Sequence, residues 1–190
     1  MPRELVYTGF VSLDGVGDSP GSTKEGHRSG GWVFATEFLP EAFALKGDEL
    51  EDTTALMFGR RSYEAFAPIW RDSEDHAAYL DLPKFVVSTT LRDVDLVDGW
   101  GATTILRSSD DVAAVKQGDG GAIFIHGSLE LARRLANEDL IDRYNLLVFP
   151  VLLGAGKGPF SREDRDRRQL HLRESESYAN GVTKLIYDVV

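Results

Sequence analysis

The stretch ALMFGRRSYEAF, residues 55–66, passes from a buried strand to a helix through a single glycine. Its first four residues are apolar, as in a strand inside a sheet, and the run stops at Gly59. A helix-like segment follows, which we expect to end near Pro68. Glycine allows close approach of a ligand, a helix start presents unpaired N–H groups, and Arg60 and Arg61 add planar phosphate donors. The stretch predicts a phosphate-binding corner; the alternative is a glycine turn followed by two solvated arginines.

Composition limits the class of protein. The chain has 190 residues, 42% of them apolar, which suits one domain covering residues 1–190. No apolar run approaches the ~20 residues of a membrane span, and the N-terminus leads directly into a strand-like run without a signal peptide. Cysteine is absent, which excludes a disulfide scaffold, a thiolate metal site and a cysteine nucleophile. We therefore expect a cytoplasmic protein.

Charge limits the partners. The formal net charge is -10 at pH 7, and such a surface repels nucleic acid and anionic membranes. An anionic ligand must then bind in a locally basic pocket. The four histidines are scattered without metal-ligand spacing, so no metal site is expected.

Strands and helices are expected to alternate along the chain, which predicts an α/β sandwich with a mostly parallel central sheet. Asn180-Gly181 between the last two strands predicts an antiparallel C-terminal hairpin. The expected strands are Leu5–Val11, Ala55–Phe58, Phe85–Ser88, Thr103–Leu106, Ala122–Ile125, Arg143–Val151, Gln169–Glu176 and Val182–Val189. The expected helices are Pro40–Asp52, Ser62–Phe66, Ser73–Leu80, Asp110–Lys116 and Ser128–Asn137.

Residues 14–31 interrupt this pattern. The segment holds six glycines together with Pro20 and several charges, and it is too long for an ordinary connection. We interpret it as a mobile lid over a site. The alternative is a flexible surface insertion.

Two further strand ends carry polar residues able to bind a phosphate. Ser88 and Thr89 follow an apolar strand, although serine and threonine are also common in ordinary turns. Gly127 and Ser128 follow another, with Ser128 expected as the N-cap of a helix that begins near Leu129. This second strand–glycine–helix corner can bind pyrophosphate through its N–H groups, and the alternative is a capped helix without a ligand.

Two acids are candidates for catalysis. Asp14 ends the first strand and could orient a ligand, or could only orient a loop through an Asx turn. Glu37 lies among Phe34, Phe38 and Leu39, and a carboxyl group in apolar surroundings has a raised pKa that suits a proton donor. The alternative for Glu37 is a glutamate that faces water.

The order of these motifs resembles the dihydrofolate reductase-like superfamily. It is most similar to stand-alone proteins related to the reductase domain of the bifunctional riboflavin biosynthesis deaminase-reductase. The resemblance extends from Leu5 to Asp188. It rests on the motifs SLDG at 12–15, FGRRSYE at 58–64, KFVVS at 84–88, IHGS at 125–128, LID at 140–142 and FPVLLGAGK at 149–157.

The resemblance implies a central eight-stranded sheet in a three-layer sandwich, and NADPH as cofactor. Gly59, Arg60, Arg61 and Ser62 would contact the cofactor phosphates, Ser88 and Thr89 the adenosine phosphate, and Gly127, Ser128 and Leu129 the pyrophosphate. The loop after Asp14 would cover the nicotinamide. A homodimer is also implied, to which the apolar run Leu146–Leu153 could contribute, although burial in the core explains that run equally well.

The implied function is an NADPH-dependent reductase. Hydride would pass to a small heterocyclic substrate, a pterin or a pyrimidine like 5-amino-6-(5-phosphoribosylamino)uracil, beside the first strand, the lid and the segment Trp32–Phe38. Asp14 or Glu37 would assist with the proton. The alternatives are a non-catalytic NADP(H)-binding or sensing module, and an interaction protein with a vestigial site.

Overall fold

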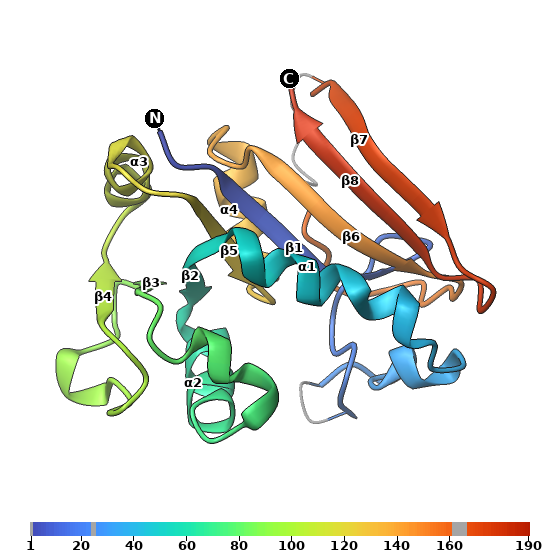
Figure 1. Ribbon diagram of the computed structural model, residues 1–190, viewed down its shortest axis with the longest axis horizontal. Coiled ribbons are helices and arrows are strands. Elements are labelled where there is room, and N and C mark those ends of the chain that lie inside the picture. Colours follow the sequence, from blue (N-terminus) through green and yellow to red (C-terminus); the bar gives the residue numbers. More distant parts are fainter. Residues whose placement is uncertain (1, 24–25, 161–166) are drawn as a thin grey trace.

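The computed structural model describes residues 2–23, 26–160 and 167–190, and these form one eight-stranded sheet with helices on both faces (Figure 1). The strand order is β4-β3-β2-β5-β1-β6-β8-β7, in which the first six strands run parallel and the hairpin β7–β8 adds antiparallel pairing at one edge. The predicted α/β sandwich with its antiparallel C-terminal hairpin is confirmed. The strands are β1 Leu5–Ser12, β2 Thr53–Gly59, β3 Lys84–Val87, β4 Thr103–Leu106, β5 Ala122–His126, β6 Arg143–Phe149, β7 Leu170–Ser177 and β8 Thr183–Val189.

In the described part of the chain, four α-helices cover the sheet, two on each face. α1 (Ala44–Asp52) and α2 (Arg60–Trp70) pack on one face, and α3 (Ser109–Gln117) and α4 (Leu129–Asn137) pack on the other (Figure 1). Short 3-10 helices occupy Trp32–Ala35, Pro40–Phe43, Glu74–Tyr79 and Asp93–Asp95. None of the helices within the described ranges has both the length and the apolar character of a membrane span.

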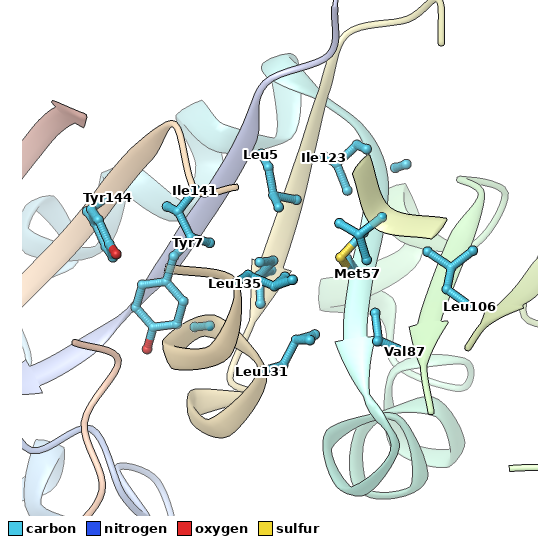
Figure 2. Close-up of a cluster of buried hydrophobic side chains, with 14 of the residues drawn as sticks. Leu5, Tyr7, Met57, Val87, Leu106, Ile123, Leu131, Leu135, Ile141 and Tyr144 are labelled. Atoms are coloured by element: carbon cyan, nitrogen blue, oxygen red, sulfur yellow. The ribbon is translucent and has the colours of Figure 1, made fainter. Parts of the chain in front are cut away.

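Alternate residues of the interior strands supply the cores on the two faces, as the period of a strand requires. Leu5 and Tyr7 of β1 join Leu131 and Leu135 of α4 in the core under α3 and α4 (Figure 2). Val6, between them, belongs to the core under α2 instead. The interior strands β1, β2, β5 and β6 are therefore buried on both faces, which explains why they appear in the sequence as largely apolar runs.

Helix α2 is longer than predicted at both ends. It begins at Arg60, so both arginines lie in its first turn, and it continues through Pro68 to Trp70. Pro68 has no N–H to donate to the carbonyl four residues earlier, but the helix continues beyond it, and the Arg71 N–H bonds to the Ala67 carbonyl at 3.1 Å. The Trp70 ring stacks on Phe66 with the ring centroids 4.9 Å apart, which holds this last turn against the core.

Two other predicted helices differ in type. The expected helix Pro40–Asp52 divides into the 3-10 turn Pro40–Phe43 and α1, and the expected helix Ser73–Leu80 is the 3-10 helix Glu74–Tyr79. In the second case, the Ser73 hydroxyl bonds to Nδ1 of His76 at 3.0 Å, and His76 stacks on Trp70 at 4.4 Å. These contacts hold the segment in the tighter winding of a 3-10 helix, which has three residues per turn.

The C-terminal hairpin turns at the predicted Asn-Gly pair. Gly181 has a φ of 84°, and Oδ1 of Asn180 accepts a hydrogen bond from the Val182 N–H at 3.1 Å. Nδ2 of Asn180 also donates to the Glu37 carbonyl at 2.9 Å. The turn therefore ties the hairpin to the segment that precedes α1.

The apolar run Leu146–Leu153 lies mostly inside the sheet. β6 is paired on both sides, with β1 and with β8, and Leu146, Leu147, Phe149 and Leu153 are buried. Pro150 and Leu152 are exposed, Leu152 with 74% of its surface. Burial in the core accounts for most of the run, and the homodimer stays a prediction.

One lysine is part of the core under α2. Lys84 is fully buried, and its Nζ donates to the carbonyls of Tyr79 and Leu80, each at 2.6 Å. The ammonium also lies 4.8 Å from the centre of the Trp100 ring. Tyr79 and Leu80 lie in the segment before β3. Because the buried Lys84 ammonium bonds to both of their carbonyls, it attaches this segment to the core.

We predict that Lys84→Ala lowers the free energy of unfolding by about 3–5 kcal/mol, since it opens a cavity and leaves two carbonyls unpaired. Lys84→Met retains the aliphatic stem and should cost less, about 1–3 kcal/mol. Urea unfolding followed by circular dichroism measures both. An Ala variant as stable as the unmodified protein would contradict a structural role for this lysine.

Candidate functional site

Two strand-to-helix corners lie side by side at the carboxyl ends of the neighbouring strands β2 and β5. Ser62 and Ser128 join them. The Ser128 hydroxyl accepts a hydrogen bond from the Gly59 N–H at 2.9 Å, and the Ser62 hydroxyl accepts one from the Ser128 N–H at 2.9 Å. We call these two residues the serine pair, because each hydroxyl satisfies the backbone of the other corner.

The serine pair leaves two helix starts without a side-chain cap. Ser128 holds the predicted N-cap position of α4, but its hydroxyl bonds to Gly59 and makes no capping bond to its own helix. This corrects the expectation of an ordinary N-cap. Helix α2 also has no side-chain cap. Each helix start carries unpaired N–H groups and about half a positive charge, so the two together form an edge whose polarity suits an anion.

Glycine is required at one corner and not at the other. Gly127 has a φ of 58°, and a Cβ atom there would lie 2.9 Å from the Phe66 ring. Gly59 has a φ of −77°, and an added Cβ would make an ordinary contact of 3.6 Å with Leu131. Ser128 is also left-handed, with a φ of 48°. The tight turn is thus at the second corner, where its strain directs the Ser128 N–H to Ser62.

Arginines surround the turn that follows β3. Nη1 of Arg60 donates to the Thr90 hydroxyl at 2.9 Å. Nη1 of Arg107 donates to the carbonyls of Ser88 and Leu91 at 2.9 and 2.7 Å, and these neutral partners do not cancel its charge. Sequence reasoning missed Arg107, although an arginine directly after the apolar end of β4 is a usable signal.

Of the two hydroxyl residues predicted to contact the adenosine phosphate, Ser88 is used within its own turn and Thr89 is exposed. The Ser88 hydroxyl accepts from the N–H groups of Thr90 and Leu91 at 3.2 and 3.0 Å, so it closes its own turn, which is the ordinary turn chemistry of serine. Thr89 is exposed.

Arg61, the second arginine of the first corner, is also exposed. The pKa of Glu130 is lowered mainly by the hydrogen bond from Lys157, and the charge of Arg61 makes a smaller contribution.

The described part of loop 14–31 is attached to its surroundings; residues 24 and 25 lie outside the described ranges. The Gly17 N–H donates to the Lys157 carbonyl at 2.8 Å, and Gly17 packs closely against the Leu129 side chain. Nε2 of His27 bonds to the Ala155 carbonyl at 2.6 Å. The loop therefore contacts the start of α4, and a lid motion would have to break these bonds.

Asp14 orients a loop. Its carboxylate accepts from the N–H groups of Leu153 and Gly154 at 3.1 and 2.7 Å, and from the Ser12 hydroxyl at 2.6 Å. These bonds, that of Ser12 first, lower the pKa of Asp14 to about 2. A group ionised at neutral pH is not a proton donor, so the geometry supports the loop-orienting alternative.

The expectation of apolar surroundings for Glu37 is wrong. Glu37 is exposed, as are Phe34 (77%) and Phe38 (68%) beside it. The segment is held instead by Trp32, which stacks edge-on against Phe149 with centroids 5.5 Å apart and donates from Nε1 to the Asp18 carbonyl. Glu37 thus faces water, which was the alternative interpretation of this residue. A catalytic role for Glu37 stays a prediction.

A buried acid that the sequence did not single out lies under α1. Glu49 accepts from the Thr8 hydroxyl at 2.6 Å and from Nδ2 of Asn145 at 2.8 Å, and it pairs with the Lys46 ammonium at 3.1 Å. His126, beside Thr8 on β5, is also buried. Burial, with smaller contributions from Lys46 and His76, lowers the pKa of His126 to about 3.

Within the described ranges, no three His, Asp or Glu residues form a metal-binding group.

The chain matches one protein family and is similar in sequence to two bacterial proteins. The family model of the RibD C-terminal domain matches residues 3–184. Two uncharacterised proteins of Bacillus subtilis strain 168 are similar in sequence. YyaP is 25% identical over 147 residues, covering 74% of this chain and 76% of YyaP. YwjB is 27% identical over 186 residues, covering 96% of each chain.

Solved structures share the fold. A protein assigned to riboflavin biosynthesis from Shewanella sp. PV-4 has a TM-score of 0.73 at 21% identity, covering 100% of this chain and 99% of that chain. A pyrimidine reductase-like protein from Corynebacterium diphtheriae has a TM-score of 0.61 at 14% identity, covering 99% and 92%. RibD from Acinetobacter baumannii has 0.64 at 13%, and this chain spans 58% of it. At these identities the likeness concerns the fold alone.

We predict that Ser62→Ala lowers the free energy of unfolding by about 1 kcal/mol, because it leaves the Ser128 N–H without its acceptor. The matched control is Ser175→Ala on the exposed strand β7, which should change stability by less than about 0.5 kcal/mol. Urea unfolding compares the two. Equal effects would show that the serine pair does not stabilise the corners.

Acid should destabilise the protein through His126. The unfolded histidine takes up a proton near its ordinary pKa of 6.5, whereas the folded one stays neutral down to about 3, so stability is lost as the pH falls below 6.5. Between about pH 7.5 and about pH 5, the unmodified protein should lose about 2 kcal/mol more than His126→Phe. Urea unfolding at both pH values measures this difference, and parallel losses would contradict a buried neutral imidazole.

Proposed function

The chain belongs to the RibD C-terminal domain family, and on that premise we propose that it is an NADPH-dependent reductase of a small heterocycle of the pyrimidine or pterin class. The observation that carries the proposal is the edge formed by the uncapped starts of α2 and α4, held together by the serine pair. Two adjacent helix starts suit a ligand with two linked phosphates.

The residues at this edge fit a pyrophosphate. The first-turn N–H groups of α4 would hold one phosphate beside Gly127 and Ser128, and those of α2 would hold the other beside Arg60 and Arg61. Glu130 in the first turn of α4 would oppose an anion, but its charge is paired with Lys157 at 2.6 Å. The protein as a whole is acidic, so this edge supplies the local positive field that an anionic cofactor needs.

The arginines near β3 favour NADPH over NADH. NADPH differs by one phosphate on the adenosine ribose, and a phosphate requires cations where a bare diol does not. Arg60 and Arg107 converge on the turn 88–91, and Thr89 and Thr90 add exposed hydroxyls there. Arg92 is paired with Asp95 and contributes less.

Bound NADPH would supply the hydride, and the chain would bind, orient and shield the reacting groups. The nicotinamide end would lie towards β1, where Gly17 of the loop contacts Leu129 and approaches the Phe10 carbonyl. The bonds of the loop to Lys157 and Ala155 would then exclude water from this end.

The second candidate function is a non-catalytic NADP(H)-binding or sensing module. It is favoured by the two expected acids, since Asp14 is a fixed carboxylate and Glu37 faces water. NADPH consumption across a panel of aminouracils, pterins and quinones separates the two functions. Oxidation of NADPH with an aminouracil or a pterin would support the reductase, whereas tight binding without turnover on any of them would support the sensor.

We predict that Arg107→Ala weakens NADPH binding about tenfold and NADH binding less than about twofold, because only NADPH carries the additional phosphate. Arg173→Ala is the matched control, since Arg173 lies on β7 at the opposite edge of the sheet. Nicotinamide fluorescence measures both affinities. Equal losses for the two cofactors would contradict the assignment of Arg107 to the adenosine phosphate.

A further inference from the structure

Two loops pack together as one unit beside the start of α4. The Gly17 N–H donates to the Lys157 carbonyl at 2.8 Å, and the Asp14 carboxylate accepts from the Gly154 N–H at 2.7 Å. Because these bonds join the two loops along their length, we expect the loops to move together. We call them the loop unit, which comprises residues 13–18 and 151–158.

Glycine lies on both sides of Lys157 because the two loops are in direct contact. A Cβ atom at Gly156 would lie 2.4 Å from the Val16 side chain, and one at Gly158 would lie 2.2 Å from the Gly15 carbonyl oxygen. Only glycine fits at either distance without displacing a loop. The glycine-rich run after β6 therefore serves close packing, and Lys157 is the side chain that extends from it to α4.

The loop unit meets α4 at two neighbouring residues. Gly17 packs against Leu129, since a Cβ atom on Gly17 would lie 2.9 Å from Cδ2 of that leucine. Nζ of Lys157 bonds to Oε1 of Glu130 at 2.6 Å. Within the described part of the chain, this is the one ion pair between the loop unit and α4. The loop unit is thus held against the helix by one apolar contact and one ion pair.

The ion pair is accessible and exchangeable. The side chains of Lys157 and Glu130 are 44% and 58% exposed, and an exposed pair of this kind stabilises a protein only slightly. The Lys157 hydrogen bond lowers the pKa of Glu130, and the charges of Arg61 and Arg133 add to this effect. Arg133 lies one turn along α4, where residues three apart are neighbours. Glu130 therefore has other cations near it when Lys157 leaves.

The ion pair also lies where the proposed cofactor would bind. Glu130 is in the first turn of α4, whose N–H groups would hold one phosphate. A phosphate in that position is attracted by the Lys157 ammonium and repelled by the Glu130 carboxylate. Because a pyrophosphate carries more negative charge than a carboxylate, it is the stronger partner for the ammonium.

We propose that the Lys157–Glu130 ion pair is a latch that closes the loop unit on α4, and that the pyrophosphate of the cofactor takes the Lys157 ammonium from Glu130 when it binds. The assignment rests on the proposed function for the identity of the ligand. Glu130 then turns to Arg133, and the ligand holds the loop unit in place of the helix. NADPH and NADH share the pyrophosphate, so Lys157 does not select between them.

The binding test is calorimetric titration of the full chain with NADP+ and, separately, with inorganic pyrophosphate. Glu130→Gln removes the competing carboxylate, so it should bind both probes about threefold more tightly. Adding Lys157→Met to this variant should weaken binding of both about tenfold, because Lys157 contacts the phosphate itself. The matched control is Arg134→Ala, added to Glu130→Gln in the same way. It removes another exposed cation of α4 and should change binding less than about twofold.

Amide hydrogen exchange of the ligand-free protein tests the latch without a cofactor. In Lys157→Met, the Gly17 amide should exchange about threefold faster than in the unmodified protein, because the loop unit opens more often. The Val6 amide, on the interior strand β1, should exchange at an unchanged rate.

The outcomes separate the latch from the proposed function. Binding of pyrophosphate by the double variant within about twofold of Glu130→Gln would overturn the latch, even where the unmodified protein oxidises NADPH with a pterin. An unchanged exchange rate at the Gly17 amide would overturn it as well. Pyrophosphate binding that depends on Lys157, without any binding of NADP+, would support the latch and contradict the reductase. Binding of neither probe by the unmodified protein would overturn both.

Discussion

The serine pair is the interaction on which the rest of the site depends: the Ser128 N–H donates to the Ser62 hydroxyl, and the Gly59 N–H donates to the Ser128 hydroxyl. It joins residues 66 positions apart in the sequence and fixes two strand-to-helix corners against each other. It also uses the hydroxyl that would otherwise cap α4, so that helix starts without a side-chain cap. A structural bond thereby leaves, in an acidic protein, two adjacent helix starts with the polarity that our proposal assigns to an anionic ligand. The arginines around the turn after β3 lie at one end of this edge, and Gly17, in the described part of the loop 14–31, packs against Leu129 at the start of α4.

The fold could be predicted from the sequence because its signals are local. Apolar runs that are buried on both faces marked the interior strands, and Asn180-Gly181 marked the antiparallel hairpin. The position of the corners also followed, since parallel strands place their carboxyl ends at one edge. The hydrogen-bond partners of the two corners could not be predicted from the sequence. Whether a hydroxyl caps its own helix, as expected of Ser128, or bonds to another corner depends on a contact between distant segments.

The buried cluster of Thr8, Glu49 and Asn145 was not predictable for the same reason. Its residues come from β1, α1 and β6, and Thr8 alone is an ordinary strand residue. The two glutamates near α1 show the limit most clearly. Glu37 follows apolar neighbours and yet is exposed, whereas Glu49 has charged neighbours in the sequence and is buried. One signal was available, since Glu49 lies four residues after Leu45 and so shares its buried helix face. A carboxylate on that face needs partners, and the sheet supplies them.

The most direct test of the central claim is the effect of NADP+ on the backbone amide resonances of the 15N-labelled protein. If the two helix starts bind the pyrophosphate, the largest shifts will occur at the amides of Arg60, Arg61, Leu129 and Glu130, with smaller shifts near Thr89. The edge strand β7 should be unaffected. Shifts confined to residues away from both corners, or no shifts at saturating NADP+, would contradict the account.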